Sequence, residues 1–187
     1  MIQRSFFACL FLCMCSSGSS LRCRWINHKF RQHSEETLNL LDMMITSTAE
    51  DAEIEDTVHF PNHLYHQAST ATAEEKLAFT AQILEEVAAL FEEDHSSASW
   101  EESTVRNFLN IVNKQAEELR SCFGSHSHGT KKSEQLYFKT EMYFKRLSDH
   151  VLKRQGHSAE AWELIRRAAR DHLMRTEHLT SSLRPAH

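Results

Sequence analysis

The sequence predicts an all-α protein of five amphipathic helices, and three observations support this fold class. The 187-residue chain contains only 4 Gly and 2 Pro, whereas β-sandwiches and α/β folds need many tight turns that use these residues. Apolar residues recur at three- and four-residue steps in five separate segments. About 25 residues separate the first two segments, which is far more than two antiparallel neighbouring helices require.

The first 20 residues have the pattern of a secretory signal peptide. Residues 1–4 carry one positive charge, residues 5–15 (SFFACLFLCMC) form an apolar run, and small residues follow at 16–20 (SSGSS). The alternative, a membrane anchor, needs roughly 20 apolar residues, and this run is shorter. No later segment is apolar enough to span a membrane. We therefore expect a secreted, extracellular protein without membrane insertion, in which residues 21–187 form a single helical domain.

Removal of the signal peptide leaves Cys23 and Cys122 as the cysteines of the mature chain. In an oxidising compartment, two cysteines are most simply explained by one disulfide bond. Such a bond would close a loop of about 100 residues and contribute at most roughly 4–5 kcal/mol by restricting the unfolded chain. The alternative, two free thiols, is uncommon outside the cell.

The first two helices are predicted over residues 25–45 and 72–93. At the start of the second, Thr72 and Glu75 have the spacing of a capping box, in which each side chain bonds the backbone N–H of the other residue. The apolar stripes consist of Leu38, Leu41, Met44 and Ile45 in the first helix, and of Leu77, Leu84, Val87, Ala88 and Phe91 in the second.

Three further helices follow. The third begins after residues 97–99 and ends at Gly124, the fourth covers residues 133–154 and ends before Gly156, and the fifth covers residues 159–174 with Ser158 as its N-cap. Because an apolar stripe on an amphipathic helix is normally buried, the stripes define architecture rather than function. They consist of Val105, Phe108, Leu109, Val112, Ala116 and Leu119; of Leu136, Tyr143, Phe144, Leu147 and Val151; and of Trp162, Ile165, Ala168, Ala169 and Leu173.

The connection over residues 46–71 is long enough to run the whole length of a bundle, so that the first two helices can lie parallel. Long crossovers of this kind are typical of the up-up-down-down bundles of helical cytokines. The predicted fold is therefore an up-up-down-down bundle of five helices with a long first crossover loop.

The sequence has no pattern typical of an enzyme or of a cofactor-binding protein. It contains no glycine-rich phosphate loop and no Ser-centred elbow motif, and its mature form has no cysteine placed for catalysis. Of the 13 His residues, three form an H-x-x-x-H-x-x-H pattern around Pro61 and two lie in a later loop, so their convergence on a zinc ion does not follow from helical spacing. These histidines are His59, His63 and His66, then His126 and His128. We expect no catalytic residues, no metal and no cofactor.

The charges are unevenly distributed along the chain. Residues 34–102 contain 17 acidic residues and one basic residue (Lys76), whereas residues 131–187 contain 12 basic and 7 acidic residues. This pattern is consistent with solvated faces, with attraction between parts of the bundle, or with steering of two different partners to two faces. Nucleic acid is not expected as a partner, because the chain is predicted to be extracellular and its net charge is −5.

The fourth and fifth helices resemble those of type I interferons. The stretch Tyr143-Phe144-Lys145-Arg146-Leu147 is similar to the family's Tyr-Phe-x-Arg-aliphatic motif, and Glu160-Ala161-Trp162-Glu163 is similar to its Cys-Ala-Trp motif. The Phe60-Pro61 dipeptide in the long first loop is also similar to the family pattern. The pair Cys23 and Cys122 stands where the family links the N-terminus to the end of the third helix. The resemblance spans the whole mature chain, although its sharpest motif covers only about 25 residues.

The sequence also departs from the family pattern. Glu160 stands where many members have a cysteine, and the long loop contains no cysteine, so the family's second disulfide is expected to be absent. The spacing between the two motifs is about one residue longer than usual, and the acidic segment 50–56 (EDAEIED) matches no hallmark of the family. Together these features resemble the two-cysteine subgroup of fish type I interferons.

The resemblance implies a monomeric antiviral cytokine that bridges a heterodimeric class II cytokine receptor and activates Janus kinases and STAT factors. One receptor chain would contact the first helix, the long loop and the last helix, and the other the face formed by the second, third and fourth helices. The match around Trp162 implies that Arg166 contacts a receptor, and Arg167 and Arg170 follow by helical position. Trp162 itself is expected in the core.

Two alternatives remain at this point. The first is another helical cytokine, such as a growth factor or interleukin of similar bundle design, which would not induce antiviral genes. A different class is a host-defence protein that acts directly on membranes through its basic last helix. The apolar stripe of that helix, which is typical of a buried face, counts against the second alternative.

Overall fold

The computed structural model describes residues 29–45, 58–123 and 130–183, and within them all regular structure is helical. This confirms the all-α prediction. In chain order the α-helices are α2 (Lys29–Met43), α3 (Asn62–Ser69), α4 (Ala73–Phe91), α5 (Glu102–Phe123), α6 (Lys131–Arg146) and α7 (Ala159–Ser181). Shorter elements are the 3-10 helices η2 (Ser96–Ala98) and η4 (Lys153–Gln155) and the π-helical stretch η3 (Leu147–Leu152). None of the described helices is both long and apolar enough to cross a membrane.

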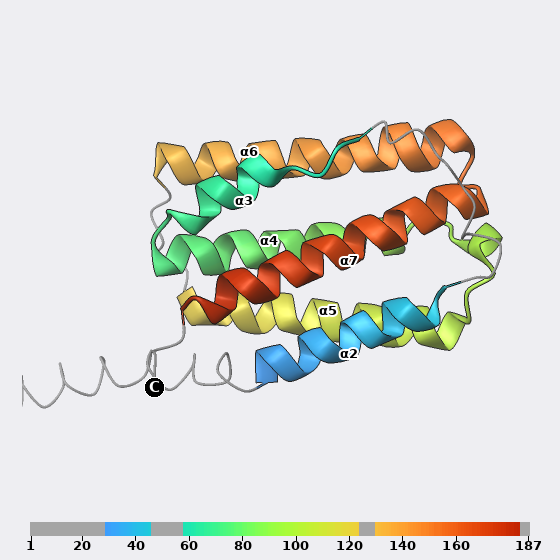
Figure 1. The fold of residues 1–187 in the computed structure, drawn as a ribbon, viewed down its shortest axis with the longest axis horizontal. Coiled ribbons are helices and arrows are strands. Elements are labelled where there is room, and N and C mark those ends of the chain that lie inside the picture. Colours follow the sequence, from blue (N-terminus) through green and yellow to red (C-terminus); the bar gives the residue numbers. More distant parts are fainter. Residues whose placement is uncertain (1–28, 46–57, 124–129, 184–187) are drawn as a thin grey trace, which may run out of the picture.

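The helices lie side by side in one bundle, in which α2, α4 and α6 run in one direction and α5 and α7 in the other (Figure 1). Three hydrogen bonds join the region of α4 to the region of α6, and in each the two residues are 55 positions apart in the chain. They are Thr130 to Glu75, Gln82 to the carbonyl of Tyr137, and Ser148 to Glu93. Because this offset stays constant along both helices, α4 and α6 run parallel. Since α2 and α4 are parallel, the chain between them must return along the bundle.

Helix α3 lies within this return segment, at a place where the sequence predicts only a loop. It begins directly after Pro61 and buries Leu64, Tyr65 and Ala68. Its eight residues are too few to make a helix stable in isolation, so tertiary contacts must support it. The acidic segment 50–56 lies outside the described residues.

Some helix ends agree with the local signals in the sequence and others differ. The start signal at residues 97–99 does not cap the third predicted helix, because residues 96–98 form η2 and α5 begins at Glu102. Residues 25–28, where the first helix is predicted to begin, lie outside the described residues. The capping box of Thr72 and Glu75 is present, and the Ser158 side chain accepts a hydrogen bond from the backbone of Ala161. The fourth predicted helix is regular only as far as Arg146 and continues as η3 and η4 to Gly156, which adopts a left-handed φ of +59°. Helix α7 extends seven residues beyond the predicted end, to Ser181.

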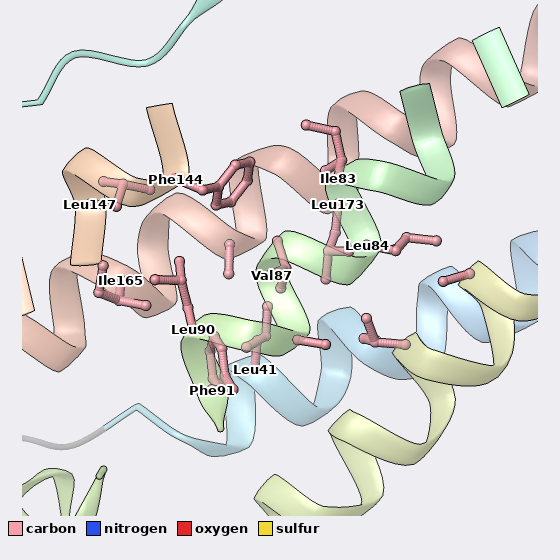
Figure 2. Packing of buried hydrophobic residues seen from close by; sticks show 14 of the residues in the cluster. Leu41, Ile83, Leu84, Val87, Leu90, Phe91, Phe144, Leu147, Ile165 and Leu173 are labelled. Carbon is pink, nitrogen blue, oxygen red and sulfur yellow. The ribbon is translucent and has the colours of Figure 1, made fainter. Parts of the chain in front are cut away.

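The core is a cluster of buried hydrophobic side chains to which every described α-helix contributes (Figure 2). All the predicted stripe residues are buried or partly buried except Ile45, which is 51% exposed. The prediction for Ile45 is wrong because this residue lies beyond the last turn of α2, where the helical repeat no longer sets its direction. Phe30 near the start of α2 is fully buried instead.

Trp162 anchors the start of α7 at one end of the bundle. It is fully buried, which confirms its predicted place in the core, and its indole N–H donates to the carbonyl of Asp94 at 3.1 Å. Its ring lies edge-on to Phe91 and Trp100, with centroids 6.1 and 5.5 Å away. These contacts hold α7 against the end of α4 and the connection that follows it.

His172 connects α7 to the return segment. It is fully buried, and its Nδ1 lies 2.7 Å from the hydroxyl of Tyr65, with which it shares a hydrogen bond. The rings of Phe60 and Phe144 lie 4.8 Å from the imidazole, centroid to centroid. Its Nε2 has no hydrogen-bond partner among the described residues. In this surrounding, burial lowers the pKa of His172 from 6.5 to about 3, so the folded protein holds the neutral imidazole.

We expect acid to destabilise the protein through His172. Below pH 6.5 the unfolded chain binds a proton at this position, whereas the folded chain excludes it until the pH approaches 3. Relative to a His172→Gln variant, the free energy of unfolding should therefore fall by about 1.4 kcal/mol per pH unit between about pH 6 and pH 4. Urea unfolding of both proteins across this range measures the difference. Equal pH dependence in the two proteins would contradict this assignment.

Candidate functional site

The three arginines that the sequence singles out lie on α7 but differ sharply in exposure. Arg166 is 5% exposed, whereas the side chains of Arg167 and Arg170 are 48% and 40% exposed. Arg166 follows Trp162 by four residues and precedes Ala169 by three, so it falls on the buried stripe of the helix. Only Arg167 and Arg170 present a charged group at the surface.

Each nitrogen of the Arg166 guanidinium donates a hydrogen bond inside the protein. Its Nε and Nη2 donate to the two carboxylate oxygens of Glu163, both at 2.7 Å, and its Nη1 donates to the carbonyl of Leu41 at 3.2 Å. A buried ion pair is tolerated when its geometry is bidentate and its remaining donors are satisfied. The carbonyl of Leu41 belongs to the last turn of α2 and also accepts a hydrogen bond from the backbone N–H of Met44 at 3.2 Å. The burial of Arg166 therefore does not fit a direct contact with a receptor.

Glu163 is the shared acceptor of two arginines. It is 4% exposed, and it also accepts a hydrogen bond at 2.7 Å from Nε of Arg167, one turn later on α7. Burial raises the pKa of Glu163, but the hydrogen bonds from Arg166 and Arg167 outweigh it, so the pKa lies below its ordinary value. The carboxylate is consequently ionised and holds Arg167 in a defined position at the surface.

Arg170 is held across the interface between α7 and α2. Its Nε lies 3.2 Å from a carboxylate oxygen of Asp42, and its Nη1 lies 3.1 Å from Sδ of Met174. Met43 and Ile45, which follow Asp42, are 69% and 51% exposed, and Met174 is 46% exposed. We refer to these neighbouring side chains together with the two exposed arginines as the α2–α7 patch: Asp42, Met43, Ile45, Arg167, Arg170 and Met174.

A groove of about 990 Å³ adjoins the α2–α7 patch at Met174. Its walls come from α2, from the segment before α3 and from the second half of α7. In its wall, Arg175 lies 5.8 Å from the ring centroid of Phe60 and donates to the side-chain oxygen of Asn62 at 3.3 Å. The groove and the patch together form a continuous surface of charged and apolar groups over these three elements.

The other exposed large hydrophobic side chains among the described residues are Tyr137, Phe138 and Met142, all on α6. The side chain of Tyr137 interacts electrostatically with Arg120 of α5, which in turn forms an ion pair with Glu85 of α4. The exposed apolar groups therefore fall into two regions, one on the α2–α7 patch and one on α6. Interfaces are enriched in aromatic residues, Met and Arg. The α2–α7 patch contains Met and Arg, and the α6 region contains aromatic residues and Met.

Several predicted residues do not enter these surfaces. Cys122 is half-buried in the last turn of α5 and packs against the core, while Cys23 lies outside the described residues. His63 and His66 are exposed on α3, and His126 and His128 also lie outside the described residues. Within the described part of the chain, no group of three or more His, Cys, Asp or Glu residues is arranged to hold a metal ion.

Comparison with known proteins gives a consistent result. The family model described as the interferon alpha/beta domain matches residues 26–183. Interferon a3 of Oncorhynchus mykiss is 35% identical over 179 residues, which cover 95% of this chain and 96% of that protein. Interferon epsilon of Sus scrofa is 29% identical over 174 residues, covering 89% and 88% of the two chains. The solved structure of zebrafish interferon 1 has a TM-score of 0.75 and 30% identity, and it covers 87% of this chain and 100% of its own.

We expect Arg166→Ala to destabilise the fold. Removing this guanidinium leaves the Glu163 carboxylate buried with one partner fewer, which should lower the free energy of unfolding by about 3 kcal/mol. Arg167→Ala is the matched control, because its half-exposed side chain binds the same carboxylate and should contribute less than about 1 kcal/mol. Urea unfolding measures the free energy of unfolding of both variants. Similar stability of the two variants would show that the buried pair does not support the fold.

Proposed function

The chain belongs to the type I interferon family, and on this basis we propose that it is a secreted antiviral cytokine that bridges two different receptor chains. The family consists of cytokines with an antiviral role, is not enzymatic, and binds cell-surface class II cytokine receptors. Bridging the two chains would activate Janus kinases and STAT factors and induce antiviral genes. The match of the interferon alpha/beta model over residues 26–183 carries this proposal.

The α2–α7 patch and the adjoining groove are the proposed site for the first receptor chain. Their walls come from the first helix, the long connection and the last helix, the elements that the family uses for one of its receptors. Arg167 and Arg170 are proposed as direct contacts, since they are exposed and already oriented by Glu163 and Asp42. Prior orientation lowers the entropic cost of binding. Arg166 is proposed to act from beneath, by holding Glu163 and the end of α2 in place.

The second receptor chain is proposed to bind the face formed by α4, α5 and α6. Tyr137 and the ion pair between Arg120 and Glu85 lie on this face and combine an aromatic group with charges of both signs. A site on each of two faces lets one molecule of cytokine hold two receptor chains at once. This arrangement needs no second copy of the cytokine, in agreement with a monomer.

The directions of the helices support the proposal that the fold is an up-up-down-down bundle of the helical-cytokine type. Helices α2, α4, α5 and α7 follow one another in these directions, and α6, which runs parallel to α4, is proposed as the additional helix. Residues 1–20 are proposed as the signal peptide and residues 21–187 as a single cytokine domain. The membrane-active alternative is weakened, because the apolar face of α7, which includes Trp162, Ile165 and Leu173, is buried.

A single disulfide between Cys23 and Cys122 is proposed for the mature protein. Only these two cysteines follow the signal peptide. The last turn of α5, which contains Cys122, is the place from which the family anchors its N-terminus. Glu160, which occupies the position of another family cysteine, caps the first turn of α7 and has its pKa lowered by hydrogen bonds from its own backbone N–H and from Ser158. These features support assignment to the two-cysteine subgroup.

The proposed function predicts receptor-dependent phosphorylation of STAT factors by the mature chain starting near residue 21. The double variant Arg167→Ala/Arg170→Ala should reduce potency at least tenfold, because exposed arginines that are fixed at an interface commonly dominate its affinity. Lys153→Ala is a control, since Lys153 is an exposed basic residue outside both proposed receptor sites that pairs with a carboxylate four residues away. A fully folded mature chain that leaves STAT factors unphosphorylated would refute the function. Equal potency of the double variant and the wild type would refute only the assignment of the two arginines.

The proposed disulfide predicts that both cysteines of the secreted protein resist alkylation until a reductant is added. Replacing Cys122 with Ser should then lower the free energy of unfolding by about 2–5 kcal/mol, because the unfolded chain gains freedom. Intact mass measurement after alkylation and urea unfolding test the two parts. Alkylation of both thiols without a reductant would exclude the bond.

A further inference from the structure

A shallow groove of about 260 Å³ lies between α3 and α6, and none of its lining residues belongs to the α2–α7 patch or to the groove beside that patch. The two helices lie next to each other (Figure 1), and Gln67 of α3 donates a hydrogen bond to the carbonyl of Lys132 at the start of α6. His63 lines the groove from α3, and Phe138, Lys139, Met142 and Arg146 line it from α6. Phe138 and Met142 are 60% and 38% exposed.

The lining of this groove contains basic, aromatic and apolar groups but no carboxylate. Residues 58–72, which include α3, contain no Asp or Glu at all. The acidic Glu141 of α6 faces the other way, toward a depression that it shares with Glu86 of α4 and with Glu93, which follows α4. Lys145 of α6 lines that depression as well, so α6 carries charges of both signs toward α4, whereas its groove with α3 is lined by basic groups and no carboxylate.

The basic residues on the α3 side form a row. Lys132, Lys139 and Arg146 are seven residues apart, which places them on one side of the helix at steps of about 10.5 Å along its axis. Lys139 and Arg146 form no ion pair among the described residues, and Lys132 lies near Glu75. In contrast, Lys145 and Lys153, on the same stretch of chain, both pair with Asp149 at 3.0 and 2.9 Å.

We propose that the groove between α3 and α6 binds a linear sulfated polysaccharide of the cell surface. Sulfate groups carry a permanent negative charge, and Lys and Arg bind such oxyanions through charge-assisted hydrogen bonds. A row of cations about 21 Å long matches a linear polyanion that presents its charges at intervals. The exposed faces of Phe138 and Met142 offer an apolar surface for the carbon skeleton of the sugar rings between two sulfates.

The groove fits a polysaccharide better than a protein partner. A stable protein interface buries about 800 Å² on each side around a continuous apolar centre. Here two exposed apolar side chains stand in a narrow row of cations, next to polar residues of α3. The net charge of −5 also means that the rest of the protein repels a polyanion, and this repulsion directs the polysaccharide to this row. The mature protein would in this way be retained near the cell surface independently of its receptors.

The test measures binding of the mature protein to immobilised heparin at about 0.15 M salt, a concentration at which weak surface attraction is largely screened. The double variant Lys139→Gln/Arg146→Gln should bind at least tenfold more weakly than the wild type. The matched control Lys145→Gln/Lys153→Gln removes the same charge from the same stretch of chain and should bind within threefold of the wild type. Fully desulfated heparin should not bind, and affinity for heparin should fall steeply as salt rises.

Two results would overturn the proposal. If both double variants lose affinity equally, overall charge and not the groove determines binding. If the Lys139/Arg146 variant binds heparin normally but loses STAT phosphorylation in cells that lack sulfated polysaccharides, the groove is a protein-binding site. Because heparin binding is measured without receptors, failure of this proposal leaves the cytokine function untouched. Circular dichroism and urea unfolding establish that each variant is folded.

Discussion

The buried contact of Arg166 with Glu163 and with the carbonyl of Leu41 connects the fold to the proposed receptor surface. It joins α7 to the last turn of α2, and these two helices carry most of the α2–α7 patch. Glu163 also fixes Arg167 at the surface. Because a buried carboxylate without its partners is costly, this arrangement has little freedom to shift. A charged group in the core thus orients the charged groups outside it.

The return segment between α2 and α4 depends on a second polar contact in the core. Tyr65 of α3 bonds His172 of α7, and the surrounding rings exclude water from this hydrogen bond. A hydrogen bond in an apolar surrounding is costly to leave unmade, so it favours one position of α3 over others. The same placement of α3 forms one wall of the groove with α6 and brings Phe60 and Asn62 to the groove beside α7. Two candidate sites therefore rely on one buried contact.

The sequence predicts those parts of the fold that depend on neighbouring residues. The capping box of Thr72 and Glu75 and the Ser158 cap are both correct, since each acts within one helical turn. Helix α3 is not predictable in this way, because it is short and its partner His172 lies 107 positions away from Tyr65. The case of Arg166 is different, since its place on the stripe of α7 indicates burial, while its charge favours exposure. The pair with Glu163 within the same helix and the contact with Leu41, 125 positions earlier, together resolve this conflict.

The two basic surfaces of the molecule differ in how their charges are balanced. Arg167 and Arg170 are each paired with a carboxylate, so their charge is largely neutralised and their geometry is fixed. Such groups act at short range, where shape and hydrogen bonds distinguish one protein partner from another. Lys139 and Arg146 have no such partner in the part of the chain that the structure describes, and their field extends into solvent until salt screens it. Balanced charges suit selective recognition of a receptor, and unbalanced charges suit capture of a polyanion, so both activities can coexist in a protein whose net charge is negative.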